Sequence, residues 1–593
     1  MIQIYPTRLS ISGFDLFKPL LFAAITVYPF IGIWQWGDLT DFGWICMEIQ
    51  NFHQRLAAGR MESPRLLSFV IGSAWWHFFS TAGVLGVLAF ASALIVLASF
   101  GVVFALKSSS CCNTSVLLAT LAAEAFYVRN VLQFDYDVVS LVFSVWSAAF
   151  VLKALPNGRL AWMFFAGVLA ALAAASRSPS VVLLGLIALP FFNEFLEGKT
   201  KTPDGYLAEE STARIRKATW QAGAFVTGFV VCLVLFVGIL WANGLLQSYV
   251  EGFAPYLVKK SSEGSGGAYD MAQVFYRYVN EANMLFPFAL MGLSWGVIAA
   301  FLFRPGSSRF SKVSFTIISL VAICLWVVHG NAQAYAHSLR FLAPGFYLMV
   351  ALAVLVNLIS CNRSVHIAIA AGCLLSIASI AGSNAGLLKL SGGLLFLVPA
   401  CTMALISARP ECKLGQASWG WQEAGVLAAL VLLVGSASAR ATQLYHAGND
   451  WLCRCHFIYP VQNVPSLTGM RTSKNKAEYL STVIPEFTRR IGDSPVYVYG
   501  HTPMIYSLLN KDSFIPEIWF ANNVYSVDFI VSRLQKRISE TGLRPSIVVT
   551  EKMALGEESW QKMMQFLSIN SYIRSYSFEE KFRPYDAELW QAK

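Results

Sequence analysis

The sequence predicts a polytopic α-helical membrane protein of about 13 transmembrane helices with a small C-terminal α/β extracytoplasmic domain. Hydrophobic residues make up 56% of the 593 residues and charged residues only 13%, whereas soluble domains carry roughly 25% charged residues. The apolar residues are gathered in blocks of about 20, the length that crosses a bilayer as a helix. The composition of the last part of the chain is mixed, as in a soluble unit.

The apolar blocks set the predicted spans. They cover residues 18–35, 80–105, 114–128, 138–153, 160–176, 180–193, 220–242, 284–303, 313–329, 341–359, 365–381, 385–407 and 422–439. If the N-terminus is cytoplasmic, every cytoplasmic connection contains Lys or Arg, as the positive-inside rule requires. The net charge of +10 then reflects topology and contact with anionic lipid, not nucleic acid. An odd number of spans places the C-terminal segment outside.

This topology divides the chain into a membrane domain, 1–440, and an extracytoplasmic α/β domain, 441–593. In the second domain, strands are predicted at 494–500, 544–551 and 571–578 and helices at 525–542 and 557–568, from alternating and helical apolar periods. The external connections of the membrane domain are 36–79, 129–137 and 243–283. We expect the protein in a bacterial inner (plasma) membrane, with the C-terminal domain in the periplasm.

Two pairs of acidic residues lie at predicted external ends of spans. Asp38 and Asp41 follow the first span, before a predicted amphipathic surface helix, and Asp135 and Asp137 precede the fourth. Either residue of the first pair could simply cap the surface helix. Carboxylates next to hydrocarbon are costly, however, and mark functional sites. The two pairs could provide a general base or hold a divalent cation, and the spacing does not separate these roles.

Basic residues on the external side form a third group. Arg177 and Arg340 abut the ends of spans, and Lys259, Lys260 and Arg277 lie in the long external connection. For either lysine alone, contact with lipid headgroups is the simpler explanation. The guanidinium groups of the two span-end arginines suit the oxygens of a shared phosphate. Acids and cations at one membrane face therefore indicate transfer from a lipid phosphate.

Five short motifs carry a resemblance to a known family. They are GDLTDFGW after the first span, FDYD before the fourth, LAAASRSPSVVLL at the end of the fifth, HSLRFLAPGFYLMVAL opening a late span, and VYVYGHTPMIYSLLN in the C-terminal segment. With their order and topology, the chain resembles the C-superfamily (GT-C) glycosyltransferases. It is most similar to the branch of the protein O-mannosyltransferases and the lipid A aminoarabinose transferase.

The resemblance implies roles for individual residues. Asp41 would be the catalytic acid-base residue, Asp135 or Asp137 the second acid, and Arg177 and Arg340 the ligands of the donor phosphate. The external connection from Lys259 to Arg277 would cover the cavity. The family's Asp-Glu pair is Asp41-Phe42 here, so that Asp38 and Glu48 are the nearest other acids and the use of a metal stays open. Tyr335 and His337 are secondary candidates for hydrogen bonds to the phosphate.

The implied reaction is transfer of a sugar, with inversion, from a polyprenyl-phosphate donor to a lipid, glycan or protein acceptor on the external face. No cofactor is required by the motifs, although a divalent cation is compatible with the acids. A lipid-linked glycan flippase or transporter is the first alternative, and it needs no external acidic cluster. A glycan polymerase or ligase is the second, and such enzymes usually carry their external domain between late spans.

Overall fold

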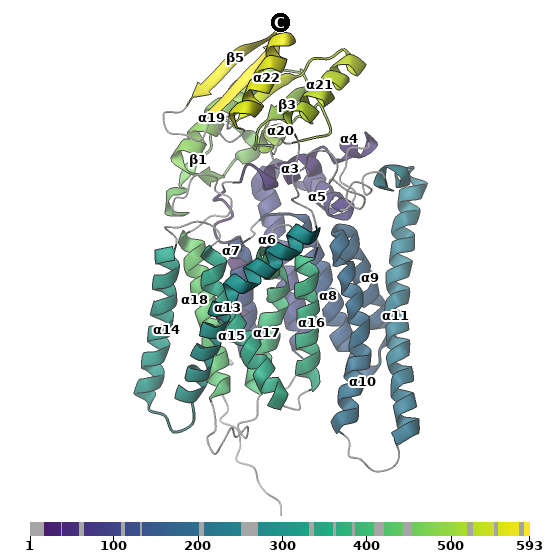
Figure 1. The fold of residues 1–593 in the computed structure, drawn as a ribbon, viewed down its shortest axis with the longest axis vertical. Helices are drawn as coiled ribbons and strands as arrows, with labels where there is room; N and C mark the ends of the chain where they lie inside the picture. The colour runs from purple at the N-terminus through teal and green to yellow at the C-terminus, as the bar shows by residue number, and fades with distance from the viewer. Residues whose placement is uncertain are drawn as a thin grey trace, which may run out of the picture.

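The fold is a bundle of long helices with a smaller α/β unit at one end, as the computed structural model shows (Figure 1). The structure describes residues 17–36, 38–58, 65–107, 113–130, 133–200, 207–250, 271–330, 337–359, 363–381, 386–407, 420–442, 454–518, 526–550, 556–579 and 586–593. This architecture confirms the predicted fold class.

Helices occupy all the predicted spans. The bundle contains α2 (Lys18–Val27), α6 (Gly83–Leu106), α7 (Asn113–Asn130), α8 (Tyr136–Asn157), α9 (Leu160–Ser176), η4 (Ser178–Ile187), α10 (Ala188–Thr200), α11 (Leu207–Ala242), α13 (Met271–Leu302), α14 (Arg309–Gly330), α15 (His337–Ile359), α16 (Arg363–Ile380), α17 (Leu390–Ser407) and α18 (Trp421–Thr442). Within the described ranges, nine helical segments are long and apolar enough to cross a membrane. Four shorter apolar helices occupy further predicted spans, and the total of thirteen stays a prediction.

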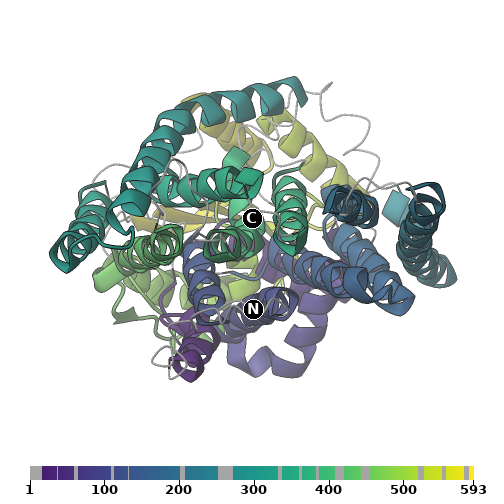
Figure 2. The ribbon, with the colours of Figure 1, turned by 90° about the horizontal axis from the view of Figure 1, so that it is seen from below.

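The outer helices have faces suited to lipid. α11 and α14 stand at opposite edges of the bundle (Figures 1 and 2). The most apolar stretches of these two helices are only 22% and 17% buried within the protein, whereas that of α17 is 89% buried. A helix that is apolar all round and exposed on most of its surface needs an apolar solvent. The bundle therefore has the surface of a membrane domain.

Three short helices lie between the first helix and α6, at the end of the bundle that faces the α/β unit (Figure 1). They are α3 (Asp41–Gln50), α4 (Phe52–Ala57) and α5 (Leu66–Phe79). α5 is apolar throughout, and a 3-10 turn and Gly83, with its positive φ of 55°, separate it from α6. The first external connection, predicted at 36–79, is thus mostly helical.

The C-terminal unit is a four-stranded mixed sheet between helices. The strands are β3 (Val496–Tyr499), β4 (Ser546–Thr550), β5 (Tyr572–Glu579) and β6 (Asp586–Ala592), in the order β3-β4-β6-β5. β3 and β4 are parallel, and β6 pairs antiparallel with both β4 and β5. Helices α21 (Val527–Thr541) and α22 (Glu557–Ile569) confirm the two predicted helices. The central strand β6 was not predicted.

Side chains of β3 alternate between two apolar clusters, as a strand with both faces covered requires. Tyr497 and Tyr499 pack with α21 and α22, whereas Val496 and Val498 pack with α19 (Lys474–Ile491) and α20 (Met504–Leu508). The second cluster continues into α3 of the membrane domain. The unit is therefore a three-layer α/β/α sandwich that shares one of its cores with the helices at the bundle end.

The prediction of an amphipathic surface helix after Asp41 is wrong in one respect, because most of its polar side chains (Glu48, Asn51 and Arg55) are buried. Residues Phe42–Ile49 of α3 are all buried. α20 packs directly on this helix, where the Met504 amide donates to the Leu39 carbonyl at 3.1 Å. A Cβ on Gly43 would lie only 2.4 Å from the Met504 nitrogen. The C-terminal unit, rather than solvent, covers α3.

Candidate active site

The first acidic pair has two different environments. Asp38 is buried, and its carboxylate accepts hydrogen bonds from the Thr40 amide (2.8 Å), the Thr40 hydroxyl (2.7 Å) and the Phe42 amide (3.1 Å). These bonds satisfy amides at the start of α3, so Asp38 acts as a helix cap. Asp41 is the first residue of that helix and is half-buried. The structure therefore favours capping for Asp38 and leaves Asp41 as the candidate base.

Glu48 belongs to a buried ion cluster. Its carboxylate accepts from the Arg55 Nε at 2.9 Å and from the Trp44 indole at 3.3 Å, and Arg55 also pairs with Asp512 of the C-terminal unit at 2.7 Å. Glu48 and Arg55 are 0% and 1% exposed. A carboxylate committed to this network joins α3 and α4 to the C-terminal unit, and its geometry favours a structural role for Glu48.

The second acidic pair lies at the start of α8. Asp135 caps that helix, with its carboxylate accepting from the Val138 amide at 2.8 Å. Burial, together with the charge of Asp137, raises the pKa of the Asp135 carboxyl to about 7. Asp135 is thus a helix cap whose carboxyl titrates near neutrality, whereas Asp137 faces two cations.

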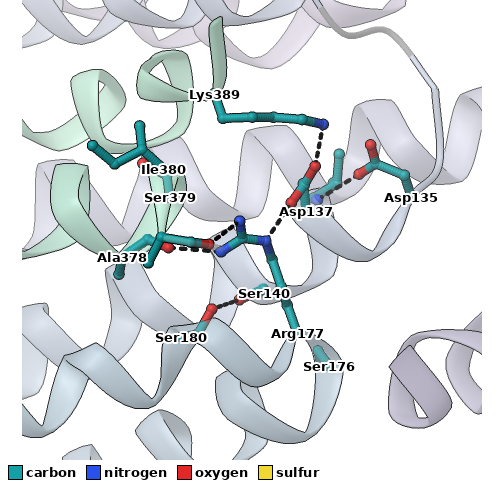
Figure 3. A network of polar contacts seen from close by, with 12 residues as sticks. Asp135, Asp137, Ser140, Ser176, Arg177, Ser180, Ala378, Ser379, Ile380 and Lys389 are labelled. Carbon is teal, nitrogen blue, oxygen red and sulfur yellow. Dashed lines mark hydrogen bonds and ion pairs between the residues drawn. The ribbon is translucent and has the colours of Figure 1, made fainter. Parts of the chain in front are cut away.

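Asp137 lies between Arg177 and Lys389 (Figure 3). The Arg177 Nε is 2.8 Å from one carboxylate oxygen of Asp137, and the Lys389 ammonium pairs with the other. Arg177 follows α9, and its two Nη atoms donate to the carbonyls of Ala378 and Ala381, at 2.7 and 2.8 Å, where α16 ends. The cluster therefore joins α8, α9, α16 and the turn before α17.

A small cavity of about 30 Å³ adjoins this cluster. Among its lining groups are Asp137, Arg177, Lys389 and the hydroxyl-bearing Tyr127, Ser140, Ser144, Ser180, Ser379 and Ser391. The Tyr127 hydroxyl is buried and has no hydrogen-bond partner among the described residues, and the hydroxyls of Ser140 and Ser180 bond to each other at 2.8 Å. A cavity of this size can hold about one water molecule. The cluster is therefore lined by hydrogen-bonding groups on its inner side.

Arg65 connects the two acidic stretches. Its guanidinium lies over the ring of Trp44, at 5.0 Å from the centroid, and over that of Tyr136, at 4.1 Å. Trp44 stands one turn after Asp41 in α3, and Tyr136 stands between the two acids of the FDYD motif. Arg65 therefore contacts the first acidic stretch and the second through one aromatic ring of each.

The other candidate residues are less informative. Arg277, on α13, is 52% exposed and pairs with Glu281 at 2.9 Å. Arg340 and His337 lie in the first turn of α15, and the structure describes only their backbone. Lys259, Lys260 and Tyr335 lie outside the described residues. The predicted roles of these residues stay predictions.

Sequence reasoning missed Lys389 and Arg65. Lys389 falls inside the predicted span 385–407, where a lone charge in an apolar stretch was the available signal. In the structure it ends a short 3-10 turn, η5 (Gly386–Lys389), just before α17. No signal in the sequence singled out Arg65.

The acids do not form an evident metal site. Among the described residues, no three His, Cys, Asp or Glu side chains gather as a metal ion requires. Asp135 is engaged with a helix N-terminus and Asp137 with two cations. Because cations already neutralise Asp137, these two residues do not fit a resident divalent cation, and we derive no step through one.

Residues 76–208 match the family model of the dolichyl-phosphate-mannose-protein mannosyltransferases. The matched segment is less than a quarter of the chain, but it contains Asp135, Asp137 and Arg177. No curated protein sequence matches the chain.

Two solved structures are similar to the chain at low identity. ArnT from Cupriavidus metallidurans, bound to undecaprenyl phosphate, is 12% identical with a TM-score of 0.43, over 96% of this chain and 97% of that one. The oligosaccharyltransferase AglB from Archaeoglobus fulgidus, in complex with an inhibitory peptide and a dolichol-phosphate, is 11% identical with a TM-score of 0.44, over 98% and 74%. At such TM-scores neither likeness carries an argument. The family match on residues 76–208 confirms the resemblance predicted from the sequence, which is to a family of membrane sugar transferases with a lipid-phosphate donor.

Proposed function

We propose that this protein transfers a sugar from a polyprenyl-phosphate donor to a lipid, glycan or protein acceptor at the membrane face that carries the C-terminal unit. One observation carries the proposal. Arg65 packs on Trp44, beside Asp41, and on Tyr136, beside the ion cluster of Asp137. A candidate base and a group of cations therefore lie at the same end of the bundle, where a lipid headgroup emerges.

The chemistry assigns a role to each group. The hydroxyl oxygen of the acceptor attacks the anomeric carbon while the bond between that carbon and the phosphate oxygen breaks. Asp41 accepts the hydroxyl proton, and the electron pair of the broken bond leaves with the phosphate. Cations near the phosphate stabilise the charge that develops on it. Attack from the side opposite the leaving phosphate gives inversion.

Further elements complete the proposal. Arg340, at the start of α15, would add a second guanidinium at the phosphate, and the connection with Lys259, Lys260 and Arg277 would cover the cavity. The division into domains 1–440 and 441–593 and the bacterial inner membrane, with a cytoplasmic N-terminus and a periplasmic C-terminal domain, are part of the same proposal. The family match supports an enzyme over a flippase, since it concerns transferases.

Mass spectrometry of surface glycans and glycolipids tests this function. Cells that lack the protein are compared with cells that carry the wild type or Asp41→Asn at equal membrane levels. We expect a mass increment of one sugar with the wild type alone, since an amide cannot accept the proton at Asp41. An increment in both strains would remove Asp41 from the reaction. No increment in either would contradict the proposed transfer.

A further inference from the structure

We propose that Lys389 is the residue that binds the donor phosphate, and that Arg177, which the sequence suggested for this role, is a positioning residue. The inference rests on the proposed function and deepens it by naming the ligand of the lipid phosphate. It follows from how the donors of the two cations are used, from the charge of their cluster and from the attachment of the turn that carries Lys389.

The hydrogen-bond donors of Arg177 are largely committed within the protein. Its Nε pairs with Asp137, and its Nη1 and Nη2 each donate to a backbone carbonyl at the end of α16. Its side chain is 7% exposed. These bonds satisfy carbonyls that a helix C-terminus leaves without partners, so turning the guanidinium toward a ligand would leave them unsatisfied. Arg177 therefore fixes Asp137 relative to α16.

Lys389 has more hydrogen-bond donors than its contact with Asp137 requires. Its ammonium carries three donor hydrogens, of which one is needed for Asp137, and its side chain is 22% exposed, three times as much as that of Arg177. It approaches Asp137 from the side opposite Arg177 (Figure 3). An anion that reaches this end of the bundle therefore meets the ammonium before it meets the guanidinium.

The charges of the cluster are unequal. Among the side chains of Asp137, Arg177 and Lys389, one carboxylate faces two cations, an excess of one positive charge. A sugar-phosphate-lipid diester brings one negative charge, and the departing lipid phosphate gains a second when the sugar leaves. A cation that is already shared with a carboxylate can turn toward this added charge. The excess thus matches a phosphate that becomes more negative during the reaction.

The turn that carries Lys389 is held in place from a different helix. Glu281 of α13 accepts the Leu387 amide at 2.6 Å, and the same carboxylate pairs with Arg277 at 2.9 Å. Tyr278, also on α13, donates its hydroxyl to the Ile380 carbonyl at 2.6 Å. The first part of α13 belongs to the long external connection, 243–283, that is predicted to cover the cavity. The position of Lys389 is therefore set by the helix at the C-terminal end of that connection.

Binding of a radiolabelled polyprenyl phosphate to the full-length protein in nanodiscs tests the inference. The neutral polyprenol of the same chain length measures what the hydrocarbon contributes. Lys389→Gln can still donate to Asp137 but has no charge, and Lys389→Arg restores the charge. Lys153→Met is the matched control, because Lys153 lies near the opposite end of α8, over the ring of Phe104 at 5.2 Å.

We expect Lys389→Gln to bind polyprenyl phosphate at least about tenfold more weakly, the loss of one hydrogen bond to a charged group. Its binding of polyprenol and its thermal midpoint should stay as in the wild type, and Lys389→Arg should recover most of the affinity. Equal binding of polyprenyl phosphate by the wild type and Lys389→Gln would overturn the inference, because glutamine can take the place of a lysine whose role is only structural.

The same data separate this inference from the proposed function. A wild type that does not prefer polyprenyl phosphate to polyprenol would overturn both. If Lys389→Gln binds polyprenyl phosphate more weakly but cells with the wild type show no sugar increment, the phosphate site stands and the transfer reaction is rejected.

Discussion

Arg55→Met should be one of the most destabilising single substitutions in this protein. Arg55 is 1% exposed and pairs with Glu48, which is 0% exposed, and with Asp512, which is 19% exposed. Its removal takes from the buried Glu48 carboxylate the guanidinium at 2.9 Å, whereas Asp512 can regain water. Breaking a buried ion pair in this way costs about 3–5 kcal/mol. Thermal unfolding of the detergent-solubilised protein, followed by tryptophan fluorescence, measures the loss.

Two further variants test the reasoning behind this expectation. Arg55→Met combined with Glu48→Gln should recover more than half of the loss, because a buried neutral amide costs less than a buried carboxylate that has lost a neighbouring cation. Arg489→Met, at a surface pair with Glu486, is the matched control and should change the midpoint little. The reasoning fails if Arg55→Met melts like the control, or if the double variant melts no later than the single one.

Gly43→Ala should disturb the contact of α3 with α20, since the added Cβ would meet the Met504 backbone at 2.4 Å; we expect about 1–3 kcal/mol of destabilisation and reduced sugar transfer. Gly223→Ala is the control, because its Cβ would meet no described residue within 4 Å apart from its chain neighbours and its own helix backbone; equal midpoints would contradict the expectation. Asp135→Asn should remove a pH dependence. Burial and the charge of Asp137 raise the pKa of Asp135 from 3.8 to about 7. The folded wild type therefore binds more protons than the unfolded chain between pH 4 and 7, and its free energy of unfolding should fall over this range by up to about 1.4 kcal/mol per pH unit. Above pH 7 this contribution should not change further. Asparagine can still cap the helix, so an unchanged slope in thermal midpoints would refute this.

Much of the fold was predictable because local sequence determines it. Blocks of about 20 apolar residues can only be helices in a bilayer, and each predicted span coincides with a helix. The same holds for α21 and α22, with their helical apolar period. β6 was missed because DAELWQA has no strong alternation, and only pairing with β4 and β5 makes it a strand. Its place in the sheet depends on long-range contacts.

The site was predictable only in part, for a related reason. The positive-inside rule assigned charged residues to one face of the membrane, and this singled out Asp137 and Arg177. It could not show that Arg177 is held by carbonyls of α16, because hydrogen bonds between distant helices leave no local pattern. Lys389 was hidden by its place in an apolar stretch, and its role became visible only through its pairing with Asp137.

The covering of α3 changes how the C-terminal unit relates to the reaction. On one side, the helix that begins at Asp41 packs on α5 through the edge-on rings of Trp44 and Phe69, whose centroids are 5.7 Å apart. On the other side, α20 contacts Gly43 too closely for any larger residue. A candidate base positioned between two such surfaces cannot shift unless one of them moves. The C-terminal unit is therefore part of what positions Asp41, and a variant that loosens α20 should act on the reaction as well as on stability.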